Sequence, residues 1–215
     1  MQWTGVMPAI TTAFDENLIV EHSFVARHAR WLVANGCSGI VCLGSLGESA
    51  TLAFDEKIAI VRTLVAAVSP AVPVVAAVSA LSTADAVRIA QASADAGAQG
   101  LMILPPYVYQ GDWRETRAHI EAILKATALP AMLYNNPVAY GTDFLPKQIQ
   151  ELAASSTVSV ETLQKAFDNV FATMDAIDTY KAKAVDSMAT TVAALETQVG
   201  RSKSYLERAR ANEGQ

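Results

Sequence analysis

Short apolar runs alternate with amphipathic segments along residues 1–154. Each run has four to six residues and little polar alternation, which is typical of strands buried on both faces. We expect five strands, at Val6–Thr11, Gly39–Leu43, Val74–Val78, Gly100–Leu104 and Ala131–Tyr134. The segments between and after the runs place apolar side chains at helical spacing and predict five helices, at Glu21–Asn35, Phe54–Val68, Ala84–Ala96, Asp112–Ala128 and Pro146–Ala154.

The order of these elements predicts a parallel α/β fold. Residues 35–39 and 96–100 each end a helix and open a strand, and they lie 61 residues apart, the length of two βα units. Successive βα units build either part of a (β/α)8 TIM barrel or a doubly wound sheet. No strand is followed by a glycine-rich nucleotide motif, which favours the barrel. A closed barrel needs eight strands, so we expect a partial barrel of about five units.

The pattern changes after residue 154. All eight prolines lie between Pro8 and Pro146, and beyond Gly141 the chain has only two glycines. From Glu161 to about Arg210, apolar residues recur every three or four positions, which predicts one long helix, or two, with a coiled-coil-like stripe. We therefore expect a partial barrel over residues 1–154 and a long amphipathic helical segment over residues 155–215.

Composition and charge argue against several functional classes. The chain has 16 basic and 21 acidic residues, a net charge of −5, which argues against a nucleic-acid-binding surface. It shows no apolar run of membrane-span length and no signal-peptide pattern. With only Cys37 and Cys42 and no disulfide framework, we expect a reducing, cytoplasmic environment. The three histidines form no metal cluster, and we expect no metal or other cofactor.

Polar residues gather after the predicted strands, where the active sites of α/β folds lie. The strands are followed by hydroxyl-bearing segments at residues 11–12, 44–48, 79, 106–109 and 134–136. Polar βα loops are common in any such fold, but the recurrence of hydroxyls at one edge indicates a site. The two glycines of residues 44–48 allow a tight turn whose N–H groups can bind a small carboxylate, although any tight βα turn needs glycine.

Three of these segments together resemble one enzyme family. The segments Gly-Ser-Leu-Gly-Glu-Ser from Gly44, Pro106-Tyr107, and Tyr-Asn-Asn-Pro from Tyr134 are similar to motifs of the dihydrodipicolinate synthase / N-acetylneuraminate lyase family. The resemblance covers roughly residues 5–154, including Met7–Thr12 and Gly141. It implies a (β/α)8 barrel that condenses or cleaves 2-oxo acids through a lysine Schiff base.

The resemblance also implies roles for single residues. Ser45 matches the first hydroxyl of the family's G-T-T-G-E turn, which relays protons to a tyrosine, and Tyr134 matches that tyrosine. These two are the candidate catalytic residues, and the candidate substrate-binding residues are Gly44, Leu46, Gly47 and Tyr107. A phenol suits proton transfer only when it is hydrogen-bonded and partly buried. Without the motif, Tyr134 would be interpreted as a strand-end aromatic packing on a loop.

Two departures concern the substrates. Val108 stands where the family usually has a second tyrosine that reaches a neighbouring subunit's site, and Tyr109 is a candidate substitute. Ala139 stands where dihydrodipicolinate synthases carry an arginine that holds the second substrate's carboxylate. Alanine cannot form that bidentate contact, which favours another 2-oxo acid, such as a deoxy sugar acid or a hydroxyproline-derived imino acid.

The third departure concerns the Schiff base itself. Residues 157–162 contain no lysine where the family places its catalytic one, and Lys165 lies about one helical turn later, inside a periodic helix. Because imine formation needs an amine of lowered pKa, we expect this chain to be a truncated lyase or aldolase that has no activity. A pyruvate-like 2-oxo acid is the small-molecule partner that the resemblance implies.

An alternative function comes from the helical segment. The last sixty or so residues, from Asp175 to Tyr205 above all, resemble the C-terminal helices of toxic-anion (tellurite) resistance proteins, although a generic amphipathic helix explains the same pattern. The chain would then be a chimeric interaction or structural protein with the half-barrel as a scaffold. An apolar stripe needs a partner, so we also expect a homo-oligomer or helix-mediated association.

Overall fold

The computed structural model describes residues 1–106 and 108–155. The chain divides into two units, Met1–Asn169 and Val170–Gln215, and every element named below belongs to the first. The expected coiled-coil-like stripe and the resemblance to toxic-anion resistance proteins fall on residues that lie outside those described. The expected domain boundary after residue 154 stays a prediction.

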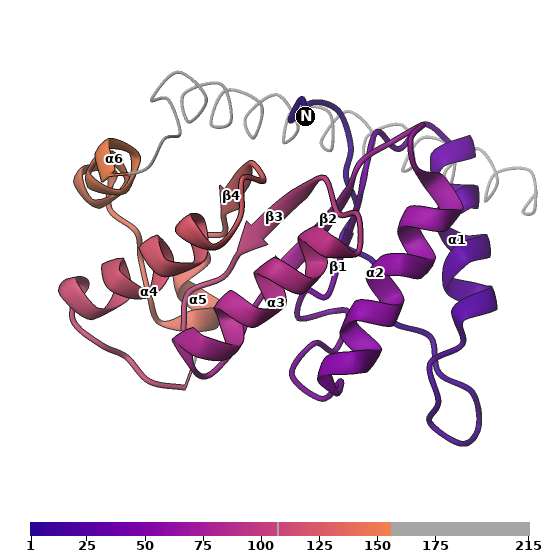
Figure 1. The fold of residues 1–215 in the computed structure, drawn as a ribbon, viewed down its shortest axis with the longest axis horizontal. Coiled ribbons are helices and arrows are strands. Elements are labelled where there is room, and N and C mark those ends of the chain that lie inside the picture. The colour runs from indigo at the N-terminus through magenta and orange to yellow at the C-terminus, as the bar shows by residue number, and fades with distance from the viewer. Residues whose placement is uncertain (107, 156–215) are drawn as a thin grey trace, which may run out of the picture. The chain divides into compact units, whose positions relative to one another are not determined.

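Helices and strands alternate along the described residues, as the apolar pattern predicts (Figure 1). Helix α1 spans His22–Ala34 and precedes four βα units. The strands are β1 (Ile40–Cys42), β2 (Val74–Val78), β3 (Gly100–Ile103) and β4 (Ala131–Leu133). The helices that follow them are α2 (Phe54–Val68), α3 (Thr83–Asp95), α4 (Trp113–Ala126), the short α5 (Pro137–Tyr140) and α6 (Pro146–Ser155). All five predicted helices are confirmed, and α5 was not predicted.

The four strands form one parallel sheet in the order β1-β2-β3-β4. Every strand therefore pairs with its neighbour in sequence, and a helix makes each crossover. Helices α2 and α3 lie along the same face of the sheet (Figure 1), which is the arrangement of a barrel segment rather than of a doubly wound sheet.

The predicted strand at Val6–Thr11 is wrong. Residues 6–11 contribute one isolated parallel bridge, between Ala9 and Val41, rather than a strand. The N–H of Ile10 donates to the Val41 carbonyl and the Val41 N–H donates to the Pro8 carbonyl, both at 2.9 Å. Pro8 has no N–H, so the ladder cannot extend toward Gly39. The described residues thus show four strands, this bridged segment and a second isolated bridge between Phe14 and Val20.

The hydrophobic core lies between the sheet and its helices. Every residue of β1, β2 and β3 is buried, which explains why their sequences show no polar alternation. Helix α2 contributes one face, including Val61 and Leu64, both 0% exposed. The residues of β4, the last of the four described strands in the sheet, are only half-buried.

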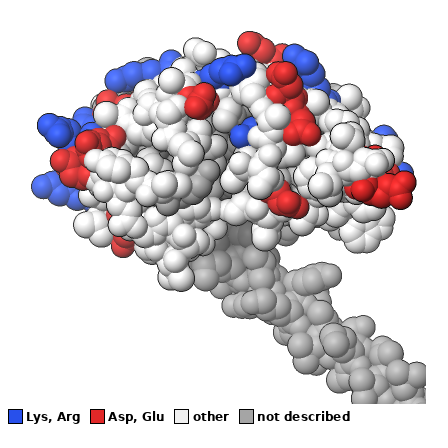
Figure 2. Space-filling view, turned by 90° about the horizontal axis from the view of Figure 1, so that it is seen from below, with Lys and Arg blue, Asp and Glu red and all other residues white. Residues whose placement is uncertain are grey.

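The surface carries charges of both signs. On the face shown in Figure 2, acidic and basic side chains alternate along the rim and uncharged residues cover most of the middle. Among the described helices, none combines the length and the apolar character that a membrane crossing requires.

Candidate active site

The glycine turn, residues 44–48, follows β1 at the carboxyl edge of the sheet. The N–H groups of Gly47 and Glu48 donate to the carbonyls of Gly44 and Ser45 at 3.0 and 3.1 Å. A Cβ on Gly47 would lie 3.1 Å from the Ile10 carbonyl oxygen and 3.3 Å from a backbone nitrogen, so glycine fits there best. Two of the N–H groups of the turn thus donate hydrogen bonds within the turn itself. Within the described part of the chain, the N–H groups of Ser45 and Leu46 remain for a ligand.

Thr12 holds the glycine turn against the N-terminal segment. Its Oγ1 donates a buried hydrogen bond of 2.7 Å to the Gly47 carbonyl, and the residue is only 8% exposed. Because Ile10 is also bonded to β1, the bridged segment ties both the strand and the turn that follows it. The hydroxyl that the sequence placed at this edge is therefore a support of the turn.

Tyr134 directly follows β4, at the other end of the same edge. Its N–H donates to the Ile103 carbonyl at 2.8 Å, which fixes its backbone to β3. The Nδ2 of Asn136 donates to the Tyr134 hydroxyl at 3.1 Å, while the Oδ1 of Asn136, the N-cap of α5, accepts from the Ala139 N–H at 3.2 Å. An amide that accepts through its oxygen must present its NH2 to the phenol. The Tyr134 oxygen is thus an acceptor, and its proton is left for another partner.

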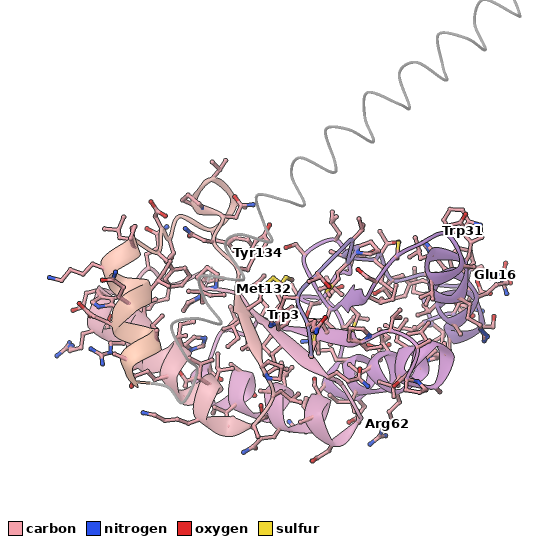
Figure 3. All side chains as sticks on the ribbon, turned by 90° about the horizontal axis from the view of Figure 1, so that it is seen from above. Trp3, Glu16, Trp31, Arg62, Met132 and Tyr134 are labelled. Atoms are coloured by element: carbon pink, nitrogen blue, oxygen red, sulfur yellow. The ribbon has the colours of Figure 1, made fainter. Side chains whose placement is uncertain are left out.

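Tyr140, which sequence reasoning missed, joins the two ends of the edge. Its hydroxyl is hydrogen-bonded to the Ser45 hydroxyl, and its ring lies edge-on to that of Tyr134, with centroids 5.9 Å apart and planes at 87°. Ser45, Tyr134 and Tyr140 form what we call the hydroxyl cluster. Through Tyr140, the cluster connects the two predicted catalytic residues, Ser45 and Tyr134. In Figure 3, Tyr134 lies on the side of the sheet away from α2, as do Met132 and Trp3.

Other predicted residues are less closely tied to the cluster. Leu46 is 67% exposed at the tip of the turn. Tyr107 lies outside the described residues. The hydroxyl of Tyr109 donates to Glu115 at 3.2 Å, at the start of α4, and the nearby carboxylates raise the pKa of this phenol. Tyr109 is therefore tied to α4 and makes no recorded contact with Ser45 in the described part of the chain.

Lys57 of α2 is the described lysine whose surroundings favour the neutral amine that imine formation needs. Burial lowers the pKa of Lys57, and Asp85 of α3 partly opposes this shift. A lowered pKa is what a Schiff-base nucleophile needs. However, the charged group that acts on Lys57 is Asp85 of α3, and no hydrogen bond within the described residues joins Lys57 to the hydroxyl cluster.

The described residues hold no group of three or more His, Cys, Asp or Glu side chains that is arranged to bind a metal ion. His119 instead pairs with Thr83, with 2.9 Å between Nδ1 and Oγ1, and His22 pairs with Thr63 at 2.8 Å. Both histidines thus join neighbouring helices.

The fold and this edge define an α/β barrel-type protein with hydroxyl groups and a glycine turn at the carboxyl ends of its strands. Residues 2–188 match the model of the Dihydrodipicolinate synthetase family, and the chain belongs to that family. The match confirms the family resemblance and extends past residue 154.

Named relatives agree with this assignment. The chain is 36% identical over 156 residues to the 4-hydroxy-tetrahydrodipicolinate synthase of Natronomonas pharaonis, covering 73% of this chain and 53% of that protein. It is 31% identical over 172 residues to the enzyme of the same name from Agrobacterium fabrum, covering 80% and 55%. The chain thus spans about half the length of the curated relatives it matches.

Solved structures confirm the barrel class. The prophage protein YagE of E. coli K12, in complex with pyruvate, superposes with a TM-score of 0.71 at 26% identity, covering 81% of this chain and 62% of that one. The chloride-inhibited dihydrodipicolinate synthase of Acinetobacter baumannii, also complexed with pyruvate, gives a TM-score of 0.68 at 27% identity, covering 71% and 52%.

Proposed function

We propose that this chain carries the hydroxyl part of a 2-oxo-acid site and binds a pyruvate-like molecule without turning it over. The observation that carries the proposal is the hydroxyl cluster, which joins Ser45 to Tyr140 and Tyr140 to Tyr134 at the carboxyl edge. Two structural relatives are complexes with pyruvate, which supports a small 2-oxo acid as the ligand. Ser45 and Tyr134 match the hydroxyls that the family uses in catalysis, and Gly44, Leu46, Gly47 and Tyr107 are the proposed substrate-binding residues.

The chemistry of the cluster suits such a ligand. A 2-oxo acid offers a carboxylate and a carbonyl oxygen, which are all hydrogen-bond acceptors. The Tyr134 proton is free to reach one of them because the Tyr134 oxygen accepts from Asn136. The N–H groups of Ser45 and Leu46 supply further donors beside it, where an anion is favoured by converging backbone N–H groups.

The proposed lack of turnover follows from the missing amine. Imine formation requires a primary amine to attack the carbonyl carbon and the resulting carbinolamine to lose water. Residues 157–162 contain no lysine, and Lys165 is part of a predicted helix. Lys57 has a lowered pKa, but no hydrogen bond within the described residues joins it to the hydroxyl cluster. Tyr134 can supply the proton for water loss, but its contacts in the described part of the chain are with Asn136, Tyr140 and Ile103 and include no lysine amine to begin the reaction.

Two measurements on the full chain test this proposal. Titration with pyruvate, followed by NMR of the ligand, should show binding that weakens in Ser45→Ala. Borohydride reduction in the presence of pyruvate should give no stoichiometric mass increase, while a full-length relative serves as the positive control. Failure to bind pyruvate would refute the proposed site. A stoichiometric adduct mapped to Lys57, Lys165 or another lysine would refute the proposed lack of imine chemistry.

A further inference from the structure

Tyr140 reaches the site through an element that the apolar pattern does not predict. Helix α5 has only four residues, with Asn136 as its N-cap, Pro137 at its first position and Gly141 ending it at φ +67°. Proline is preorganised for a first turn, and glycine adopts a positive φ without strain. Six residues after Tyr134, the chain has therefore turned back so that the two tyrosine rings meet edge to face, a favoured aromatic geometry.

The Tyr140 hydroxyl connects strands that are not neighbours. Ser45 follows β1 and lies 95 residues earlier in the chain, and β2 and β3 separate β1 from β4 in the sheet. The two hydroxyls have one proton each, and the bond between them uses one of the two. Whichever group donates, one hydroxyl proton of the pair remains available to an acceptor on a ligand.

No other described phenol takes this position on Ser45. Val108, at the place where the resemblance implies a second tyrosine from a neighbouring subunit, has no hydroxyl and is 71% exposed. The Tyr109 hydroxyl is bonded to Glu115. In the described part of the chain, the phenol that reaches Ser45 is thus that of Tyr140.

We infer that Tyr140 is a positioning residue that orients the Ser45 hydroxyl from within the same chain, so that the hydroxyl cluster needs no tyrosine from a second subunit. The inference rests on the proposed 2-oxo-acid site and adds to it the residue that makes the site independent of subunit contacts. Tyr140 acts through Ser45, and its ring keeps Tyr134 in place by edge-on packing.

A double-mutant cycle on pyruvate binding tests this role in the full chain. Ser45→Ala and Tyr140→Phe should each weaken pyruvate binding by about 2- to 10-fold, the range of one hydrogen bond. The double variant should bind no more weakly than either single variant, because both remove the same bond. Tyr109→Phe is the matched control and should bind like the wild type. The affinity of the wild type should be the same at low and at high protein concentration.

A spectroscopic measurement separates positioning from simple packing. With tyrosine labelled at the ring carbon that bears the hydroxyl, the Tyr140 resonance, assigned through its loss in Tyr140→Phe, should shift in Ser45→Ala. The Tyr109 resonance should not move. Phenylalanine keeps the ring packed on Tyr134, so the fold should persist in Tyr140→Phe.

The outcomes distinguish this inference from the proposed function. If the wild type binds pyruvate and Tyr140→Phe binds equally well, the inference is wrong and the proposed site stands. Losses that add in the double variant, an unmoved Tyr140 resonance, or an affinity that rises with protein concentration would also overturn the inference. If the wild type does not bind pyruvate, the proposed site and the inference are both wrong.

Discussion

Replacing Thr12 by valine removes one hydroxyl from the buried contact between the bridged N-terminal segment and the glycine turn. Valine has nearly the shape of threonine, so the change deletes the 2.7 Å bond to the Gly47 carbonyl and little else. A carbonyl that loses its donor in a buried place costs about 1–3 kcal/mol. The added methyl returns up to about 0.8 kcal/mol. We expect the free energy of unfolding to fall by about 1–2 kcal/mol.

The effect of Thr12→Val should be visible globally and locally. At about 2–4 °C per kcal/mol for a chain of this size, the melting temperature followed by circular dichroism should fall by about 2–8 °C. Hydrogen exchange measured by mass spectrometry should accelerate in peptides that cover the glycine turn, because local opening becomes cheaper. Thr12→Ser is the control, since it keeps the hydroxyl and loses only a methyl group.

The control decides the interpretation. Exchange at the glycine turn should stay close to that of the wild type in Thr12→Ser even though a buried methyl is lost. Equal exchange in Thr12→Val and the wild type would refute the supporting role of Thr12. So would equal acceleration in the serine and valine variants, because the serine variant retains the bond.

Three further predictions concern other parts of the described residues. Burial raises the pKa of Cys42 to about 12, so iodoacetamide at neutral pH should label Cys37 alone in the native protein and both cysteines after denaturation, as counted by intact mass. Burial lowers the pKa of His119 below its unfolded value of 6.5, so its neutral form favours folding; this stability is present above pH 6.5 and is lost as the pH falls. His119→Gln should therefore flatten the acid side of the curve of unfolding free energy against pH. Gly141→Ala should lower the free energy of unfolding by about 1–2 kcal/mol in urea titrations, because Gly141 has a φ of +67°.

Each of these three predictions has a decisive contrary result. Two labels on the native protein would contradict the burial of Cys42. An unchanged pH curve in His119→Gln would assign the acid sensitivity to other groups. For Gly141, asparagine tolerates the left-handed conformation better than alanine, so Gly141→Asn should cost less. Equal costs would mean that backbone strain is not the cause.

The helices and the sheet could be predicted because hydrophobic periodicity encodes them directly. In α2, the predicted bounds, Phe54–Val68, are those of the structure. The first strand was wrong because an apolar run does not reveal how many ladder bonds it makes, and Pro8 removes one of them. The expectations for residues 156–215 and for self-association stay predictions.

The candidate site was only half predictable. Ser45 and Tyr134 were found through motifs, but their link depends on Tyr140, which lies 95 residues from its partner. No short-range pattern encodes a contact of that separation. A local signal for α5 was present, because Asn136-Pro137 followed by Gly141 is a cap, a first-position proline and a terminating glycine. Those signals predict a helical turn, but not the strand end toward which it points.

The sequential order of the sheet has a consequence for how the molecule assembles. Among the four described strands, each pairs with its neighbours in sequence, so pairing can spread one unit at a time with modest loop-closure entropy. The contact between Ser45 and Tyr140 is different, because it requires the first and last of these units to be docked together. A ligand that binds to both residues would therefore stabilise the docked arrangement of β1 and β4. Its binding free energy would add to the stability of the described sheet.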